Sequence, residues 1–302
     1  MKEFIKNHCF NIIMVIIFIL GIAVVAYPTI SDYWNSRVQS KAIGDYRSSV
    51  ENANAAELEK LKFAAQLYNE SLYECQIAGR PADESASDYE SVLNINGDGI
   101  MGYIEIPLIS VELPIYHGTD DDILRVAVGH SPSSSLPSGG VNTHAVLLGH
   151  RGLPTARLFN DLDQLSHGDY FEIYTLGDVL TYEIYKIETI EPKDLDKLRI
   201  EGGEDIVTLV TCTPYGINSH RLLIHGKRID SISSSKLLIY SEARKVNTAY
   251  VAVAVGIVLW AIAMTAIIYI SSRWSRSKLS RDEIIRRREI LARYYEKERK
   301  KR

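Results

Sequence analysis

Cysteine is scarce in this chain of 302 residues, which has three: Cys9, Cys75 and Cys212. A secreted domain held together by disulfide bonds usually carries more cysteines, in even number, so we do not expect a disulfide-dependent scaffold. A Cys75–Cys212 disulfide is conceivable, but it would consume the thiol of Cys212. No C-x-x-C or H-x-x-x-H pair occurs, and Cys212, His220 and His225 lack the usual zinc spacing. The G-x-S-x-G motif of serine hydrolases is also absent. We therefore predict no metal, no cofactor and no serine nucleophile.

Two long, predominantly apolar segments contain no charged residue, 10–27 and 249–270. Each is long enough to cross a hydrocarbon layer of about 30 Å at about 1.5 Å per residue. The first segment could instead be a signal peptide, but the sequence before Pro28 makes a poor cleavage site, so we expect a retained anchor. The second segment could be a buried helix of a soluble protein, although its uncharged length favours a membrane span.

Positive charge is concentrated at the two ends of the chain. Lys2 and Lys6 precede the first apolar segment, and thirteen basic residues against five acidic ones follow residue 270. Basic residues favour the cytoplasmic side, so we predict a membrane protein with two spans, both termini cytoplasmic and the intervening part outside. The basic tail next to an anionic membrane needs no nucleic acid partner, and we predict none.

The sequence after the first span predicts helices. Apolar residues recur at helical spacing from Ser31 to about Gly79, and Gly44 and Asn52 suggest a break between two helices. Residues 79–88 are small, polar and rich in turn formers, which indicates a loop. We interpret the helices as a brace that holds the following domain away from the membrane.

After Gly102 the sequence pattern changes to short segments typical of β-strands. The residues Leu176-Gly177-Asp178 are typical of a hairpin turn between two of them. One short helix is expected over 155–162. Eight short strands in about 130 residues favour a closed, mainly β barrel over a doubly wound sheet. The expected strands are 103–106, 113–117, 124–128, 145–148, 170–174, 180–187, 206–211 and 221–225.

The segment 206–225 places a thiol and a guanidinium at the adjoining ends of two strands. Cys212 ends the first apolar strand, Pro214 and Gly216 start a loop, and Arg221 begins the second strand. Neighbouring residues of a strand point to opposite faces, so His220 faces away if Arg221 faces the thiol. A free thiol becomes a stronger nucleophile beside a cation or an imidazolium.

Eight histidines compete for the role of the acid and base. His150 is the strongest candidate because it follows the apolar strand 145–148, just as Cys212 ends its own strand. The rival is His220, next to Arg221. For His117, His130, His144 and His167, which lie in or near turn-like segments, we expect solvated side chains.

Four segments together resemble a known family. The pattern TLVTC-TP-x-G-x-N-xx-R-L, with GDGIMGYIEIP (97–107), LPIYHGT (113–119) and LLGHRGLP (147–154), resembles the signature of sortases, membrane-anchored transpeptidases of Gram-positive bacteria. The resemblance covers roughly residues 92–230 and is strongest to class C, the pilus-assembling sortases. It implies an eight-stranded sortase-type barrel with N-terminal helices. It also implies Cys212 as nucleophile, His150 as acid and base, and Arg221 as the cation that stabilises the oxyanion.

The resemblance also implies a reaction and partners. Cys212 would cleave an LPxTG-like sorting signal between Thr and Gly, and a lysine of a pilin subunit would resolve the thioacyl enzyme. An amino group of a cell-wall precursor is the alternative acceptor, for which the substrates would be surface proteins. The usual class C lid carries an Asp-Pro-aromatic motif, whereas here Pro81 precedes Asp83 and the next aromatic residue is Tyr89. The loop is therefore a linker or a lid-like segment without the usual anchor.

These inferences divide the chain into seven parts. They are a cytoplasmic N-terminus (1–9), a membrane anchor or uncleaved signal (10–27), an extracytoplasmic helical region with a lid-like loop (28–91), the catalytic barrel (92–230), a linker (231–248), a second membrane helix (249–270) and a basic cytoplasmic tail (271–302).

Two other interpretations compete with a sortase. The first is an anchored, non-enzymatic binding barrel in which Cys212 is only a buried strand residue, as free cysteines commonly are. It does not explain why Arg221 and the His150 segment occur together with the thiol. The second is a papain-like protease, but in those enzymes the cysteine leads its domain, whereas here His150 precedes Cys212 by 62 residues.

Overall fold

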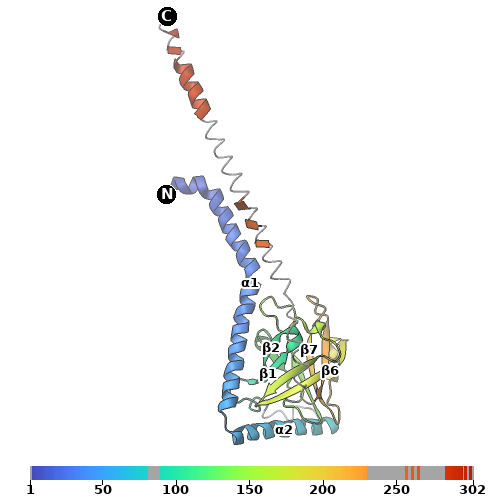
Figure 1. The fold of residues 1–302 in the computed structure, drawn as a ribbon. Coiled ribbons are helices and arrows are strands. Elements are labelled where there is room, and N and C mark those ends of the chain that lie inside the picture. The colour runs from blue at the N-terminus through green and yellow to red at the C-terminus, as the bar shows by residue number, and fades with distance from the viewer. Residues whose placement is uncertain are drawn as a thin grey trace. The chain divides into compact units, whose positions relative to one another are not determined.

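The structure is a computed structural model that describes residues 2–80 and 89–229, together with short helical pieces between 256 and 300. Its centre is a closed barrel of eight strands in the spatial order β1-β2-β3-β4-β7-β8-β6-β5 (Figure 1). The strands are β1 (Ile100–Ile106), β2 (Val111–His117), β3 (Val128–His130), β4 (Thr143–Leu148), β5 (Tyr170–Thr175), β6 (Asp178–Ile190), β7 (Asp205–Thr213) and β8 (His220–Ile229).

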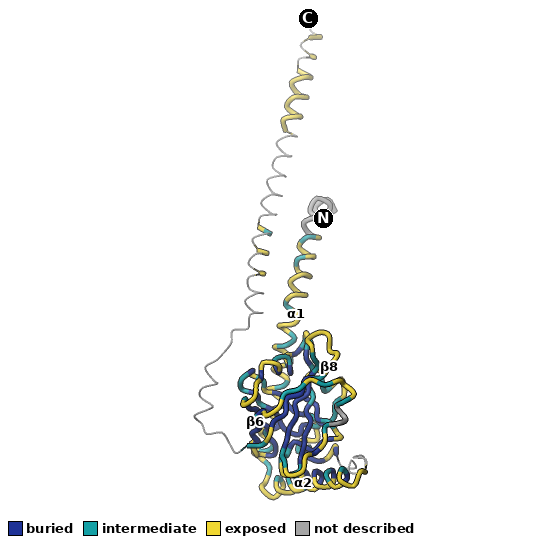
Figure 2. Tube along the Cα trace, turned by 90° about the vertical axis from the view of Figure 1, so that its right-hand side faces the viewer, coloured by how far each residue is buried: buried dark blue, intermediate teal, exposed yellow. Residues whose placement is uncertain are grey.

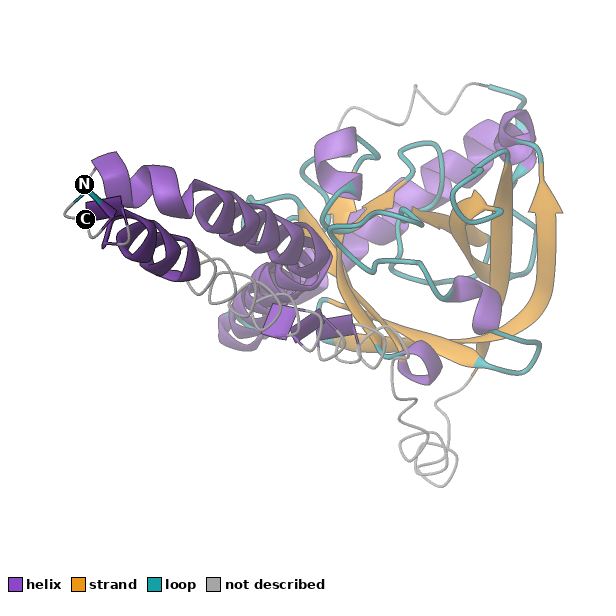
Figure 3. Ribbon diagram, turned by 90° about the horizontal axis from the view of Figure 1, so that it is seen from above, coloured by secondary structure: helices purple, strands orange, loops and turns teal. Residues whose placement is uncertain are grey.

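The predicted mainly β barrel with N-terminal helices is confirmed. Apolar residues from every side of the barrel meet in one core, and Ile104, Phe171, Leu209 and Ile224 are fully buried there. Figure 2 shows this buried centre in dark blue, and Figure 3 shows the strands curving into a closed wall. Two strand pairs are parallel, β2 with β3 and β4 with β7, and the other neighbouring pairs are antiparallel.

The predicted hairpin turn is also present, since β5 and β6 pair antiparallel up to Thr175 and Asp178. Leu176 and Gly177 both have positive φ, 44° and 85°. Positive φ at both central residues is what a tight type I′ turn requires. This turn fixes the register of the two strands.

Two predicted elements are wrong. Residues 124–128 do not form a strand: a short helix α3 (Asp121–Leu124) precedes β3 at 128–130. The helix expected over 155–162 is replaced by turns that lead into the 3-10 helix η3 (Leu162–Gln164). In both places a short apolar run packs in the core without forming the predicted element. Ala127 and Val128 are buried in the first run, and Leu158 and Phe159 are buried in the second.

The N-terminal helices are longer than predicted. Helix α1 (Lys2–Asn52) runs through Pro28 and Gly44 without a break, and α2 (Ala55–Ile77) follows. The chain turns where Asn54 caps α2, its side-chain Oδ1 accepting from the Glu57 N–H at 2.7 Å. The break at Asn52 is therefore confirmed, whereas the one at Gly44 is wrong.

Among the described helices, one is long and apolar enough to cross a membrane. It is the stretch of α1 from Ile13, whose most apolar window has a mean hydropathy of 2.7 and no buried residue. The predicted first span thus lies within the same continuous helix as the predicted brace. The predicted second span (249–270), the linker (231–248) and the loop residues 81–88 lie mostly or entirely outside the described residues.

The chain divides into two units, Met1–Arg244 and Lys245–Arg302. Within the second unit, residues 283–294 are helical, and their side chains are exposed. Part of the predicted basic tail is therefore a helix.

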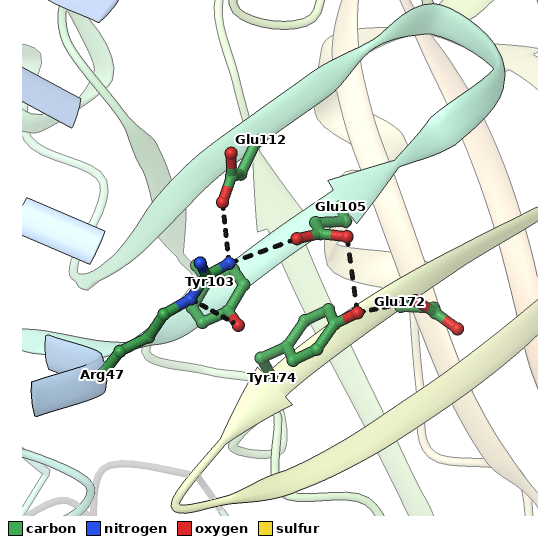
Figure 4. Close-up of polar contacts among 6 residues, drawn as sticks. All are labelled: Arg47, Tyr103, Glu105, Glu112, Glu172 and Tyr174. Carbon is green, nitrogen blue, oxygen red and sulfur yellow. Dashed lines mark hydrogen bonds and ion pairs between the residues drawn. The ribbon is translucent and has the colours of Figure 1, made fainter. Parts of the chain in front are cut away.

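Helix α1 is held on the barrel by a polar cluster (Figure 4). The Arg47 guanidinium donates to Glu112 at 2.8 Å, to Glu105 at 3.3 Å and to the Tyr103 hydroxyl at 2.9 Å. Tyr103 stacks on Tyr174, with ring centroids 4.5 Å apart. One cation on α1 thereby joins β1, β2 and, through Tyr174, β5.

Helix α2 crosses the barrel at the end where β7 begins (Figure 1). The buried Asn69 side chain accepts from the Leu136 N–H at 2.7 Å and donates to its carbonyl, and Lys62 pairs with Asp178 at 2.7 Å. Gln76 makes two further bonds to the Ile200 backbone. The contacts leave the opposite end of the barrel, where β7 ends, uncovered by α2.

Candidate active site

The thiol and the guanidinium lie side by side at the end of the barrel where β7 finishes. Cys212 is the penultimate residue of β7 and is directly opposite Arg221 of β8 in the antiparallel register. Directly opposed residues point to the same face, so both side chains share one side of the sheet. Both are partly exposed. The predicted pairing of Cys212 with Arg221 is therefore present in the fold.

His150 reaches the same place from the other side of β7. Strands β4 and β7 run parallel with Leu148 opposite Val210, and the Gly149 N–H donates to the Val210 carbonyl at 3.1 Å. β4 ends at Leu148, and His150 follows two residues later, just as Cys212 follows Val210 by two residues in β7. Cys212 and Arg221 thus belong to the adjacent strands β7 and β8, and His150 belongs to the loop directly after β4, the neighbour of β7 on its other side.

Contacts of Thr211 and Phe159 hold the backbone at Gly149 and His150 in place. The Thr211 hydroxyl, buried on the other face of β7, donates to the Gly149 carbonyl at 2.7 Å. A side chain at Gly149 would have its Cβ 2.5 Å from the Phe159 ring, so only glycine fits there. The Phe159 N–H in turn donates to the His150 carbonyl at 3.2 Å. These contacts set where the imidazole leaves the backbone.

Arg151 is a second cation at the site, which sequence reasoning missed. Its nearly buried guanidinium pairs with Asp163 at 2.5 Å, donates to the Asn160 carbonyl at 3.1 Å and reaches the Thr213 hydroxyl at 3.5 Å. Its charge also lies over the Tyr215 ring, 5.8 Å from the centroid. Arg151 therefore joins the loop after His150 to the residues after Cys212. Its position directly after His150 was the available signal.

The rival histidine points elsewhere. His220 pairs with Thr213 in the register, one position beyond Cys212, and is exposed, with its Nδ1 2.8 Å from the Ser219 hydroxyl. Neighbours on a strand face opposite sides, so His220 and Arg221 diverge as predicted.

Three of the four histidines expected to be solvated are buried. His117, His130 and His144 have exposed fractions of 4%, 0% and 5%, whereas His167 is exposed as predicted. Burial lowers the pKa of His130 to about 4, and also lowers that of His144. The prediction failed because backbone carbonyls and hydroxyls that the fold brings close satisfy these rings, as the Thr208 hydroxyl of β7 does for His144 at 2.7 Å.

The arrangement suits nucleophilic acyl transfer. A thiol supplies the nucleophile, an imidazole in reach can take and return a proton, and a permanent cation can balance charge on a carbonyl oxygen. Arg221 makes its two bonds within the described residues through Nη1, to the carbonyls of Asn218 and His220. Nη2 and Nε are thus the donors that can turn toward a substrate. The assignment of these three roles to Cys212, His150 and Arg221 stays a prediction from the sequence.

Comparisons with known proteins identify the family to which this fold belongs. A family model described as a sortase domain matches residues 104–229. Sortase D of Bacillus subtilis is 34% identical over 131 residues, a match that covers 42% of this chain and 63% of that protein. The chain thus spans somewhat less than two thirds of that relative.

Solved structures extend the likeness over a larger share of the chain. Sortase C1 from Streptococcus agalactiae is 42% identical with a TM-score of 0.60, covering 64% of this chain and 100% of that one. Sortase C from Clostridium perfringens is 36% identical with a TM-score of 0.54, covering 63% and 99%. The predicted resemblance to class C sortases is therefore confirmed.

Proposed function

This chain belongs to the sortase family of cysteine transpeptidases, and from that membership we propose that it cleaves an LPxTG-like sorting signal and transfers the acyl part to a lysine of a pilin subunit. The observation that supports the proposal is the register that sets Cys212 of β7 opposite Arg221 of β8, with His150 two residues after the end of β4, the other neighbour of β7. Support for pilin as the substrate comes from the class C neighbours, one of which, sortase C of Streptococcus pneumoniae, is described with reference to pilin substrate specificity. One of these neighbours, from Clostridium perfringens, is described with the C-terminal cell wall sorting motif.

In the first half of the reaction, the Cys212 thiolate attacks the Thr carbonyl of the Thr–Gly bond. The carbonyl π electrons move to oxygen, and Arg221 with backbone amides balances that charge. Collapse of the tetrahedral intermediate breaks the C–N bond, and His150 gives its proton to the departing glycine amine. A thioester on Cys212 remains.

In the second half, a lysine amine replaces the glycine. His150, now neutral, takes a proton from the attacking amine, and Arg221 again faces the oxyanion. Collapse of this intermediate breaks the C–S bond, and an isopeptide bond has formed between threonine and lysine. The Cys212 sulfur leaves as thiolate beside the imidazolium, so the enzyme returns to its starting state.

The membrane arrangement belongs to the same proposal. The apolar part of α1 from Ile13 serves as the first span, and the uncharged segment 249–270 serves as the second. Both termini are then cytoplasmic, and the barrel faces the outside, where sorting signals and pilin lysines are presented. The enzyme acts at the cell membrane on substrates that are themselves secreted.

The test uses the full chain in detergent micelles with a fluorescent LPxTG peptide and a lysine-bearing pilin domain. We expect mass spectrometry to find a thioester on Cys212 and an isopeptide adduct on the pilin lysine. Both should vanish in Cys212→Ala. The matched control is Cys75→Ala, since Cys75 is a buried cysteine of α2 that forms no disulfide and lies away from the site, and its loss should leave both products.

The products separate the alternatives. A thioester without a lysine adduct, resolved instead by a cell-wall precursor amine, would retain the sortase chemistry and move the acceptor to the wall. If no thioester forms on Cys212, or if Cys212→Ala retains cleavage, the proposed function is wrong.

A further inference from the structure

Helix α1 presents two different faces where it passes the barrel. Asp32, Asn35 and Gln39, spaced three and four residues apart, are half-buried against the barrel. Trp34 and Val38, on the other side, are 69% and 51% exposed. The first face therefore docks on the barrel, although it is polar at this level.

The polar face binds backbone groups of the loop that follows His150. The Asp32 Oδ1 accepts from the Arg157 N–H at 2.9 Å, and the Asn35 Nδ2 donates to the Thr155 carbonyl at 2.8 Å. These bonds join residues 125 and 120 positions apart in the chain. An N–H and a C=O two residues apart are thus held by an acceptor and a donor on one helix face.

The held loop leads directly to His150. Two residues after Arg157, the fully buried Phe159 donates its N–H to the His150 carbonyl and packs where a Gly149 side chain would be. A displacement of residues 155–157 would move Phe159, and with it the backbone from which the imidazole projects. Packed interiors transmit such shifts because they contain little free volume.

We propose that α1 positions the catalytic histidine, with Asp32 and Asn35 as the positioning residues. Because the same helix contains the apolar segment from Ile13, the active-site loop is tied to the membrane anchor without a flexible linker. This inference rests on the proposed function for the role of His150. Without α1, the barrel would keep Cys212 opposite Arg221 but would lose one set of contacts that positions His150.

The test is an exchange of isosteric side chains in the full chain in micelles. Asp32→Asn retains an oxygen that accepts from the Arg157 N–H, so activity should stay within about twofold of wild type. Asn35→Asp replaces the donor by an acceptor opposite the Thr155 carbonyl, and Asp32→Ala removes the acceptor. For these two we expect kcat of thioester formation to fall about tenfold with little change in KM, since misplacing a catalytic group costs rate rather than binding.

Two readouts do not depend on the substrate. The pH profile of Cys212 alkylation by iodoacetamide should change in Asn35→Asp and Asp32→Ala, because the imidazole moves relative to the thiol. Hydrogen exchange of the Arg157 amide should quicken in Asp32→Ala and stay slow in Asp32→Asn. Ser36→Ala, on the exposed side of the same turn, is the matched control and should behave as wild type in all assays.

The outcomes distinguish this inference from the proposed function. If wild type forms no thioester, the proposed function fails, while alkylation and exchange still test the coupling between α1 and the loop. If Asn35→Asp and Asp32→Ala only lower the melting temperature, with kcat and the alkylation profile unchanged, α1 is a structural brace and the inference is overturned.

Discussion

At the residue scale, Arg151 is the group whose removal tests the site most directly. Its guanidinium binds Asp163, the Asn160 carbonyl and the Thr213 hydroxyl at once, from a nearly buried position. Lysine retains the charge but not the planar fork that makes several bonds. We expect Arg151→Lys to lower kcat about tenfold or more in the LPxTG assay, because the loops after His150 and Cys212 are no longer joined.

Asp163→Asn is the control for Arg151. The amide can still accept from the guanidinium, and Asp163 is half exposed, so we expect less than a threefold loss of kcat. Equal losses in the two variants would mean that the ion pair, rather than the fork across the two loops, carries the effect.

Which residues the sequence could reveal follows from strand geometry. Cys212 and Arg221 could be placed together because alternation along a strand decides which residues share a face. Arg151 and the bond from Thr211 to the Gly149 carbonyl could not, because their partners come from another strand or a distant loop. The buried histidines were missed for the same reason: a ring such as His144 is satisfied by Thr208 and the Arg199 carbonyl, which are remote in sequence.

At the element scale, periodic segments were predictable and irregular ones were not. The hairpin at Leu176-Gly177 and the apolar strand 145–148 carry strong local signals, and both are present. The runs 124–128 and 155–162 have apolar residues without a clear period, so propensity alone chose wrongly between strand, helix and turn. Helix α1 passes Gly44 without a break because one glycine costs a helix only about 1 kcal/mol, which the rest of a long helix tolerates.

The attachment of α1 to the barrel gives a prediction about stability. Arg47→Met keeps the aliphatic stem but removes the donors to Tyr103, Glu105 and Glu112 (Figure 4). Because the Arg47 side chain is 45% exposed, solvent screens the ion pairs, and we expect a loss of about 1 kcal/mol in unfolding free energy. Thermal melting in micelles measures it.

Arg37→Met is the matched control for Arg47, since Arg37 is exposed and donates to Tyr33 within α1. It should leave the melting temperature within error. The pKa of Glu105 is raised, chiefly by burial and then by Glu112, and Arg47 opposes that rise. Removal of Arg47 should therefore raise the Glu105 pKa further. An unchanged Glu105 pKa would contradict the interaction of Arg47 with Glu105.

At the scale of the whole molecule, the barrel class was predictable but its strand order was not. Counting turn-bounded strands gives eight, whereas the parallel pairs β2–β3 and β4–β7 depend on crossovers that no local pattern specifies. The β4–β7 pair also puts the loop that holds His150 next to β7, and no local pattern specifies that pairing, so the partnership of His150 with Cys212 stays a prediction that rests on the strand-end pattern and on the resemblance to sortases.

The buried histidines of the barrel make its stability depend on pH. Burial is the main cause that lowers the pKa of His130 and of His225, each to about 4, from the ordinary value near 6.5. Between those pH values the unfolded chain binds protons that the folded chain does not. Stability is therefore fully present above about pH 6.5 and is lost as the pH falls toward 4.

Each such histidine contributes a slope of up to about 1.4 kcal/mol per pH unit in this window. Melting temperatures of the full chain between pH 7 and 4.5 should fall steadily, and His225→Gln should show a shallower decline than wild type. The carboxyl of Asp205, whose pKa is raised by burial, acts in the opposite direction, so the comparison with His225→Gln isolates the histidine contribution. A melting temperature that stays level or rises on acidification, with the same profile in His225→Gln, would show that these rings are protonated in the folded barrel.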